Sequence, residues 1–352
     1  MNNDEQVAKN AMVLIKSQSG CQLLKEKSLS NPAFANNILF PEIKLNLKDI
    51  CCDLFGNLLI ETLFDLLTYE NFDLFLSITK NYFYDICLSE PGSRVLQKLI
   101  DKIHVYPLLL NKFIVNLNHK DIGLLFSSPY GNHILQKYLS IIGKKEFTNF
   151  IYEYIFNNFL KIVKDKYGVC VIQKSLYEGD KDQRRQIFEM ISKNIEIIMK
   201  DAFGSFLIHF IFTKLEKKNL EEILPLIRKI EENLVDYCKN KNSAFVIEKC
   251  FERGDQKISE HFIKYLLENH SNSIIDIVSN PYGFYAIKKI KHLKNNKLIE
   301  EVMKNIVNNI EKLNQSNKAN EIILTFSHEF KEFSNLLFEK NKYPTKFVNK
   351  EA

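Results

Sequence analysis

A spacing of 36 to 40 residues recurs along the chain and limits how it can fold. Seven of the 11 glycines fall in one register, and a serine fills the remaining place. A unit of this length cannot bury its own apolar face, so neighbouring units must stack and share a continuous core. The sequence therefore predicts an array of eight repeats. The register consists of Gly20, Gly56, Gly92, Gly131, Gly168, Gly204, Ser243 and Gly283.

Each copy carries the signals of a helix. Three places before the glycine position stands a residue whose side-chain oxygen favours a helix N-cap. Three places after it begins an apolar pair, from Leu23-Leu24 in the first copy to Ala286-Ile287 in the eighth. The pair predicts a buried stripe, and the glycine predicts a close approach to the helix of the neighbouring repeat. The predicted caps are Ser17, Asp53, Ser89, Ser128, Asp165, Asp201, Asn240 and Asn280.

The segments between the copies complete the predicted fold. Stretches such as residues 149–164 have a helical apolar period and are long enough for one or two further helices per repeat. No strand-like alternation bounded by turn signals competes with them. The predicted fold class is therefore all-α, with the architecture of an α-solenoid.

Composition narrows the possible partners and compartments. The net charge of +5 permits a polyanionic partner without requiring one. Seven cysteines without a C-x-x-C pair favour neither a zinc site nor a disulfide framework. The polar, acidic amino terminus lacks the features of a secretory signal, and no apolar stretch approaches the roughly 20 residues that cross a bilayer. We expect a soluble protein of a reducing compartment that makes no contact with a membrane.

No motif in the sequence points to an enzyme. Neither a phosphate-binding G-x-x-x-x-G-K-[ST] loop nor a G-x-S-x-G nucleophile turn occurs, and His328-Glu329 lacks the second histidine of a zinc helix. His209 is the best single candidate for acid or base chemistry, but spacing places no carboxylate beside it. We expect no catalytic residues, no metal and no cofactor.

Three positions of each copy form what we call the triplet: the two residues after the glycine position and the residue after the apolar pair. On a helix these positions share one face, directed away from the apolar pair. Middle members are often planar, and third members end in a hydrogen-bonding group. Planar groups stack on nucleobases while polar ends bond to base edges, so the pattern predicts single-stranded nucleic acid. A protein-binding groove with incidental aromatic residues is the alternative.

Three sets of residues follow from this interpretation. A lysine after the third member stands one turn beyond the stacking residue and is predicted to meet phosphate. The predicted base-edge residues are Cys21, Lys25, Asn57, Glu61, Ser93, Gln97, Asn132, Gln136, Gln173, Ser205, His209, Glu248 and Lys288. The predicted stacking residues are Gln22, Arg94, His133, Cys170, Phe206, Phe245 and Tyr285. The predicted phosphate-binding residues are Lys98, Lys137, Lys174, Lys249 and Lys289.

The strings PGSRVLQKL, YGNHILQKY, YGVCVIQKS and NSAFVIEKC resemble the core motif of Pumilio (PUF) repeats, and eight copies match that family's usual number. The resemblance covers about residues 10–330. It implies a curved α-solenoid, or α-α superhelix, of eight three-helix repeats within one domain over residues 1–352, with short helical caps at both ends. It also implies that single-stranded RNA binds the concave face at about one base per repeat, with its 5′ end on the carboxy-terminal repeats.

The resemblance assigns bases to some copies. Asn132 and Gln136, with His133 stacking, resemble the uracil-reading set. Ser93 and Gln97, with Arg94 stacking, resemble the adenine set. Glu248 resembles the acid that accepts from guanine, although Ala244 replaces its usual serine partner. The sixth to eighth triplets depart from the sets that family members use for a UGU element.

We therefore expect a monomeric, sequence-selective RNA-binding protein that acts on mRNA, most simply at a 3′ untranslated region, with protein cofactors on the convex face. Post-transcriptional regulation of translation in the cytoplasm is the expected role. One alternative is a PUF-like ribosome-assembly factor that holds pre-rRNA in the nucleus or nucleolus with relaxed base choice. Another is a protein-binding solenoid scaffold.

Overall fold

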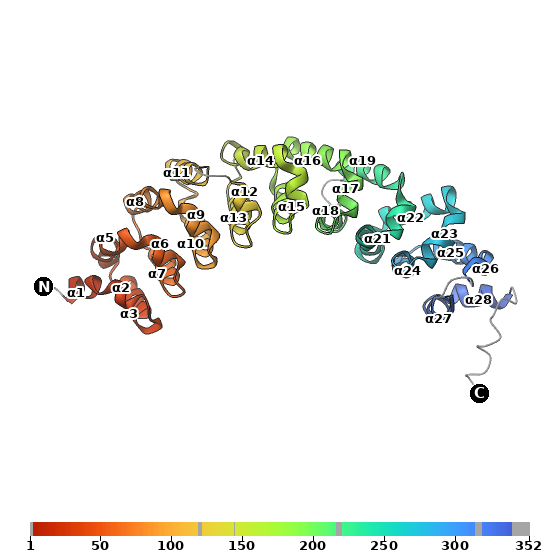
Figure 1. Ribbon diagram of the computed structural model, residues 1–352, viewed down its shortest axis with the longest axis horizontal. Coiled ribbons are helices and arrows are strands. Elements are labelled where there is room, and N and C mark those ends of the chain that lie inside the picture. Colours follow the sequence, from red (N-terminus) through yellow and green to blue (C-terminus); the bar gives the residue numbers. More distant parts are fainter. Residues whose placement is uncertain (1–2, 119–121, 144, 216–219, 314–318, 340–352) are drawn as a thin grey trace, which may run out of the picture. The chain divides into compact units, whose positions relative to one another are not determined.

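The computed structural model describes residues 3–118, 122–143, 145–215, 220–313 and 319–339. Every regular element in these ranges is a helix (Figure 1). The helices belong to two compact units, residues 1–184 and 185–352. The prediction of an all-α repeat fold is confirmed.

The first unit contains five copies of the repeated helix. In the third repeat, α8 (Tyr69–Thr79) leads through the short α9 (Phe83–Leu88) into α10 (Glu90–Ile103), which carries the triplet. We call α10 and its counterparts the motif helices. They follow one edge of the unit, and α8, α11 and α14 follow the opposite edge (Figure 1). The other helices of this unit are α1 (Asn3–Lys9), α2 (Ala11–Leu14), α3 (Gln18–Ser30), α4 (Pro32–Phe34), α5 (Phe40–Ile43), α6 (Leu47–Cys52), α7 (Gly56–Leu63), α11 (Pro107–Leu117), α12 (Gly123–Phe126), α13 (Gly131–Ile141), α14 (Lys145–Val163) and α15 (Gly168–Glu178).

The second unit repeats this plan with three motif helices, α18 (Gly204–Phe210), α21 (Lys241–Arg253) and α24 (Gly283–Lys288). Helix α21 packs against both of the others, and α27 packs against α24. Helix α16 (Lys181–Lys193) spans the boundary between the units. The remaining helices are α17 (Ile195–Lys200), α19 (Leu220–Glu231), α20 (Leu234–Lys239), α22 (Gln256–Asn269), α23 (Ile274–Ser279), α25 (Asn296–Asn308), α26 (Ile310–Leu313), α27 (Ala319–Glu329) and α28 (Lys331–Glu339).

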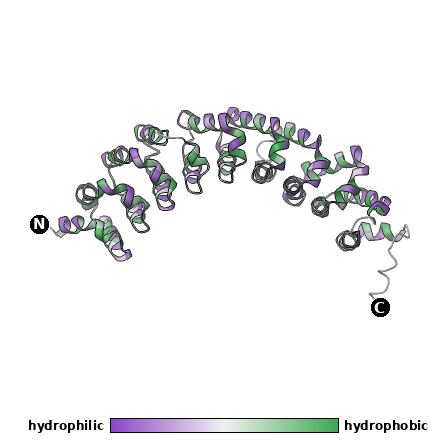
Figure 2. Cartoon of the chain, viewed as in Figure 1, coloured by the Kyte–Doolittle hydropathy of each residue, from purple (hydrophilic) through white to green (hydrophobic). Residues whose placement is uncertain are grey.

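Short 3-10 and π segments extend several of these helices. The π segments are η1 (Ala35–Leu39) and η4 (Ile211–Leu215), and the 3-10 segments are η2 (Lys44–Asn46), η3 (Lys80–Tyr82), η5 (Ser271–Ser273) and η6 (Lys289–His292). Around each helix hydrophobic and hydrophilic residues alternate (Figure 2), as expected for helices that bury one side. Among the described residues, no helix has the length and apolar character that crossing a bilayer requires.

The N-cap position is confirmed for Ser17, Ser89 and Asn240, whereas in the other five copies the α-helix begins only at the glycine, three residues after the predicted cap. The bond predicted for the cap nevertheless forms in all eight copies. In each copy the side-chain oxygen of the cap accepts a hydrogen bond from the backbone N–H three residues later, at distances from 2.8 Å for Asp165 to 3.4 Å for Asn240. Both residues of every apolar pair are buried, except for Leu23 of the first pair, which is 47% exposed. Helix α3 packs against the next motif helix, α7, and among the described residues no motif helix covers its other side. The prediction of burial was wrong for Leu23 alone.

The glycines approach a different partner from the one we predicted. A Cβ added to Gly92 would lie 2.3 Å from the carbonyl oxygen of Ile86, which belongs to α9 of the same repeat. The nearest contact of each glycine in the register is therefore with the helix that precedes its motif helix, not primarily with the neighbouring repeat. Ser243 takes the glycine's place in the seventh copy, and its hydroxyl donates to the carbonyl of Tyr237 at 2.8 Å.

Candidate nucleic-acid interface

The triplets lie at three levels of burial. First members are buried in all eight copies, so the expectation that the whole triplet faces outward is wrong for them. Two of them bond to the next repeat: the Ser93 hydroxyl donates to the carbonyl of Tyr130 at 2.9 Å, and the Cys21 thiol donates to that of Phe55 at 3.1 Å. Asn57, Asn132 and Ser205 instead donate to carbonyls of their own repeat. The buried first members are Cys21, Asn57, Ser93, Asn132, Val169, Ser205, Ala244 and Phe284.

Middle and third members reach the surface. Six middle members are exposed, among them Phe206 at 45% and Tyr285 at 48%, and the other two, Cys170 and Phe245, are half-buried. All eight third members are half-buried: Lys25, Glu61, Gln97, Gln136, Gln173, His209, Glu248 and Lys288. Six of the eight motif helices thus present an exposed side chain beside a half-buried polar one. The predicted stacking residues and the third-member base-edge residues are therefore accessible, whereas the base-edge residues predicted among the first members are buried. Those buried residues are Cys21, Asn57, Ser93, Asn132 and Ser205. The base-reading roles stay predictions.

In the third and fourth repeats the first and third members bond to each other. The Gln97 amide donates to the Ser93 hydroxyl at 3.2 Å, and the Gln136 amide donates to Asn132 Oδ1 at 2.7 Å. Asn132 is itself held by its Nδ2, which donates to the carbonyl of Ser128 at 2.7 Å. A side-chain amide has two N–H donors and a carbonyl, so this bond occupies only one of the groups of Gln136. The buried residue therefore fixes the orientation of the third member.

In the second unit the side chains of neighbouring triplets contact one another through their rings. The Phe206 and Phe245 rings, from α18 and α21, are in edge contact with centroids 5.9 Å apart, and the His209 ring lies 5.8 Å from Phe245. The Lys249 ammonium lies 5.7 Å from the same Phe245 ring. Burial lowers the pKa of His209, and the nearby charge of Lys249 lowers it further, so the imidazole is neutral at pH 7.

The five predicted phosphate-binding lysines are all engaged with carboxylates. Three of them reach back to an acidic residue of the preceding repeat, and we call these contacts the inter-repeat ion pairs. An engaged lysine must exchange its partner to bind phosphate, so its phosphate role stays a prediction. The inter-repeat ion pairs are Lys98–Asp65 at 2.9 Å, Lys137–Asp101 at 2.7 Å and Lys289–Glu252 at 2.6 Å, and the pairs within one helix are Lys174–Glu178 at 2.9 Å and Lys249–Glu252 at 2.5 Å.

Sequence reasoning missed the acidic partners of these lysines. Asp65, Asp101 and Glu252 each stand nine places after the glycine position of their own repeat. Each pairs with a lysine six places after the next glycine position. This recurring register was visible in the sequence. The inter-repeat ion pairs that follow from this register link neighbouring repeats by charge, in addition to the apolar packing between them.

We predict that Glu252 stabilises the second unit only while it is ionised. Hydrogen bonds from Lys249 and Lys289 lower the pKa of Glu252 to about 2. A pKa that is lower in the folded state gives a stabilisation that is present in full above the unfolded value of about 4.3 and is lost as the pH falls toward 2. Glu252→Gln should therefore melt below the wild-type protein at pH 7, and the difference should shrink between pH 5 and pH 2. Thermal unfolding followed by circular dichroism measures this.

Glu300→Gln is the control for that experiment. Glu300 pairs with Lys304 one turn further along α25, and both side chains are about half exposed, so the pair joins no repeats. Such exposed pairs contribute little. A melting difference for Glu252→Gln that does not change with pH, or one no larger than that of Glu300→Gln, contradicts the inter-repeat role of Glu252.

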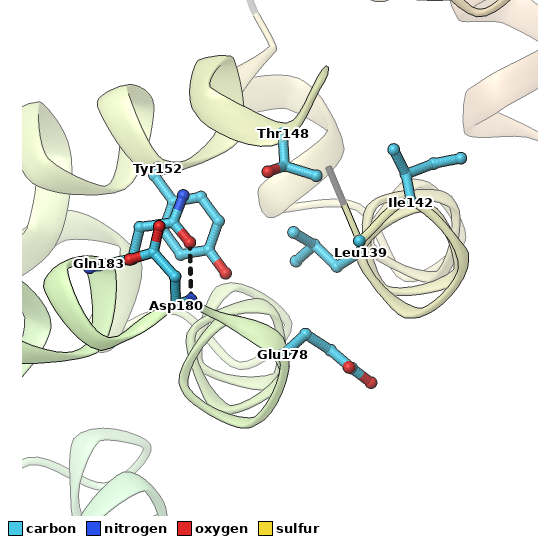
Figure 3. A pocket seen from close by; sticks show the side chains of 8 residues that line it. Leu139, Ile142, Thr148, Tyr152, Glu178, Asp180 and Gln183 are labelled. Atoms are coloured by element: carbon cyan, nitrogen blue, oxygen red, sulfur yellow. Dashed lines mark hydrogen bonds between the residues drawn. The ribbon is translucent and has the colours of Figure 1, made fainter. Parts of the chain in front are cut away.

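A small pocket of about 110 Å³ in the first unit lies apart from the triplets (Figure 3). It is formed where α13 and α15 end and α14 and α16 begin. The Tyr152 hydroxyl donates to the carbonyl of Ser175 at 3.0 Å, and Gln183 Oε1 accepts from the backbone N–H of Asp180 at 3.0 Å. None of its lining residues belongs to a triplet. The exposed triplet members instead lie on open helix surface, which suits an extended ligand.

Comparison with known proteins connects this arrangement to one family. The profile of the Pumilio-family RNA binding repeat matches residues 46–77, 82–104, 158–192 and 233–267, which contain the second, third, fifth and seventh copies. Pumilio homolog 12 of Arabidopsis thaliana is 24% identical over 80% of this chain and 47% of its own length. Suppressor protein MPT5 of Saccharomyces cerevisiae is 31% identical over 46% of this chain and 20% of its own. The chain thus spans about half or less of the curated relatives it matches.

Two solved structures share the fold. The Puf4 RNA binding domain, bound to an HO endonuclease RNA 3′ UTR recognition sequence, superposes with a TM-score of 0.78 at 24% identity, covering 89% of this chain and 97% of that one. The RNA-binding domain of yeast Puf5p bound to MFA2 RNA gives a TM-score of 0.67 at 21% identity, covering 92% and 97%. The helical repeat plan derived from the sequence is therefore the plan of these domains.

Proposed function

Since the chain belongs to the Pumilio (PUF) family of RNA-binding, non-enzymatic repeat proteins, we propose that it recognises single-stranded RNA by sequence through its triplets and thereby acts on mRNA. A single observation carries the proposal. The third and fourth motif helices each present an exposed planar side chain, Arg94 or His133, beside a half-buried amide that a buried neighbour holds in place. Stacking and edge recognition need these two elements side by side.

The expected target is an element in a 3′ untranslated region. The Puf4 domain binds such an element in its solved complex, and the fold is shared. We further propose that the protein works in the cytoplasm as a monomer and regulates translation by recruiting other proteins. One observation favours a nuclear or nucleolar role on pre-rRNA with relaxed base choice. Two first members of the second unit, Ala244 and Phe284, have no polar side-chain group.

In vitro selection from a random single-stranded RNA pool tests the proposal. We expect a recovered consensus of about one base per repeat and an affinity that falls as salt rises, because lysine contacts to phosphate release counterions. Binding without a consensus supports the pre-rRNA alternative. No binding of any single-stranded RNA at low salt leaves only a protein scaffold.

A further inference from the structure

The two units differ in what their triplets can do with a base. In the first unit, Gln97 and Gln136 are held by polar first members of their own helices. In the second unit, Ala244 and Phe284 offer no polar side-chain group, and the Ser205 hydroxyl donates to the backbone carbonyl of Ala202. The support that orients Gln97 and Gln136 in the third and fourth repeats is therefore missing from the triplets of the second unit.

The third members of the second unit are also engaged. His209 lies against the Phe245 ring with centroids 5.8 Å apart, and Lys288 pairs with Glu329 at 3.3 Å. The Glu248 carboxylate lies 3.9 Å from the ammonium groups of both Lys249 and Lys289. These distances are too long for hydrogen bonds, and both ammonium groups bond instead to Glu252. Glu248 therefore lies beside positive charge with no polar first member in its own triplet to orient it.

The space between the sixth and seventh motif helices is closed by aromatic contact. Stacked bases repeat at about 3.4 Å, so a base sandwiched between two parallel rings holds them about 7 Å apart. The Phe206 and Phe245 centroids are 5.9 Å apart, and their planes are inclined by 69°. These rings contact each other edge to face, which is a favoured geometry for an aromatic pair. No base inserts between them without breaking that contact.

Phe206 and Tyr285 are exposed aromatic members of these triplets, and Phe245 is half-buried. Phe206 is 45% exposed and Tyr285 is 48% exposed. An exposed aromatic face stacks on any base, because every base has a π-face. We propose that the second unit holds RNA through Phe206, Phe245 and Tyr285 without choosing bases, and that base choice is confined to the first unit. This inference rests on the proposed RNA-binding function.

Two variants of the full chain identify which RNA position faces which repeat. Gln97→Glu and Gln136→Glu should each change the preference at one RNA position, and together these positions give the direction in which the RNA runs. Counting onward from the fourth repeat then identifies the three positions that face the sixth to eighth repeats. Each of these positions is replaced by all four bases in turn, and the affinities of the wild-type protein are measured.

We expect the four bases to differ by less than about threefold at these three positions and by about tenfold or more at the two marked ones, the scale of a lost edge bond. A preference of about tenfold or more at any position facing the second unit overturns the inference. If the wild-type protein binds no single-stranded RNA at all, the proposed function fails instead, so the two failures are distinguishable.

A ring-removal variant tests the stacking half of the inference. Replacing Phe206, Phe245 and Tyr285 by Ala should weaken every RNA by the same factor of at least about tenfold, since one stacked base accounts for roughly 5- to 150-fold. The matched control, Phe206→Tyr with Phe245→Tyr and Tyr285→Phe, keeps the rings and should keep the affinity. An unchanged affinity in the Ala variant, or a loss that depends on base identity, overturns the inference. Should the triple variant melt early, Tyr285→Ala alone gives the same readout at one exposed site.

Discussion

Changing Asn132→Ser together with Gln136→Glu should move the base preference at one RNA position from uracil toward guanine. Gln136 is half-buried and held by Asn132 at 2.7 Å, so its free N–H can donate to a uracil carbonyl. A carboxylate only accepts, and it suits the N–H groups of guanine. A mismatched edge leaves a polar group unpaired, so discrimination of about 1 to 3 kcal/mol is expected. Binding to RNAs that exchange U for G at each position in turn measures it.

The same exchange in the next repeat, Gln173→Glu, is the control. Its first member is Val169, which offers no side-chain hydrogen bond to orient the new carboxylate. We therefore expect a shift at the adjacent RNA position that is smaller than the shift produced in the fourth repeat. An even loss of affinity at all positions in the Asn132→Ser/Gln136→Glu variant would mean that this triplet supports the helix and reads no base.

The local features of the repeat were predictable because they depend on residues close in sequence. An N-cap bonds to a backbone N–H three residues away, so Ser89 and Asn240 could be assigned without knowledge of the fold. The apolar pairs follow from helical period in the same way. Period, cap and pair together predict the motif helix and its stacking into a repeat array.

Features that depend on neighbouring repeats were not predictable from one copy. Ser93 lies on the outward side of its own helix, yet its hydroxyl is buried because Tyr130 of the next repeat covers it. Leu23 has the same pattern as the other apolar pairs but lacks a covering motif helix in the described part of the chain. The contact of Phe206 with Phe245 depends on how α18 and α21 are spaced. Spacing along one helix does not contain this information.

The contact between each motif helix and its preceding short helix leads to a prediction about stability. Gly92→Ala would place a Cβ 2.3 Å from the Ile86 carbonyl oxygen and 2.5 Å from the Ser89 hydroxyl that caps the helix. The backbone carbonyl of Ile86 and the cap residue Ser89 leave the added methyl group little room. Overpacking together with a disturbed cap should cost about 2 to 4 kcal/mol. Urea unfolding should show a lower midpoint with an unchanged slope.

Gly143→Ala is the matched control for this prediction, because nothing lies within 4 Å of a Cβ added at that position. The same substitution in open space should change the free energy of unfolding by no more than about 0.5 kcal/mol. The two variants add the same methyl group to the same unit, so their difference isolates the contact with Ile86. If both variants unfold at the same urea concentration, the close approach of α10 to α9 does not constrain the register, and the recurrence of glycine every 36 to 40 residues needs another cause.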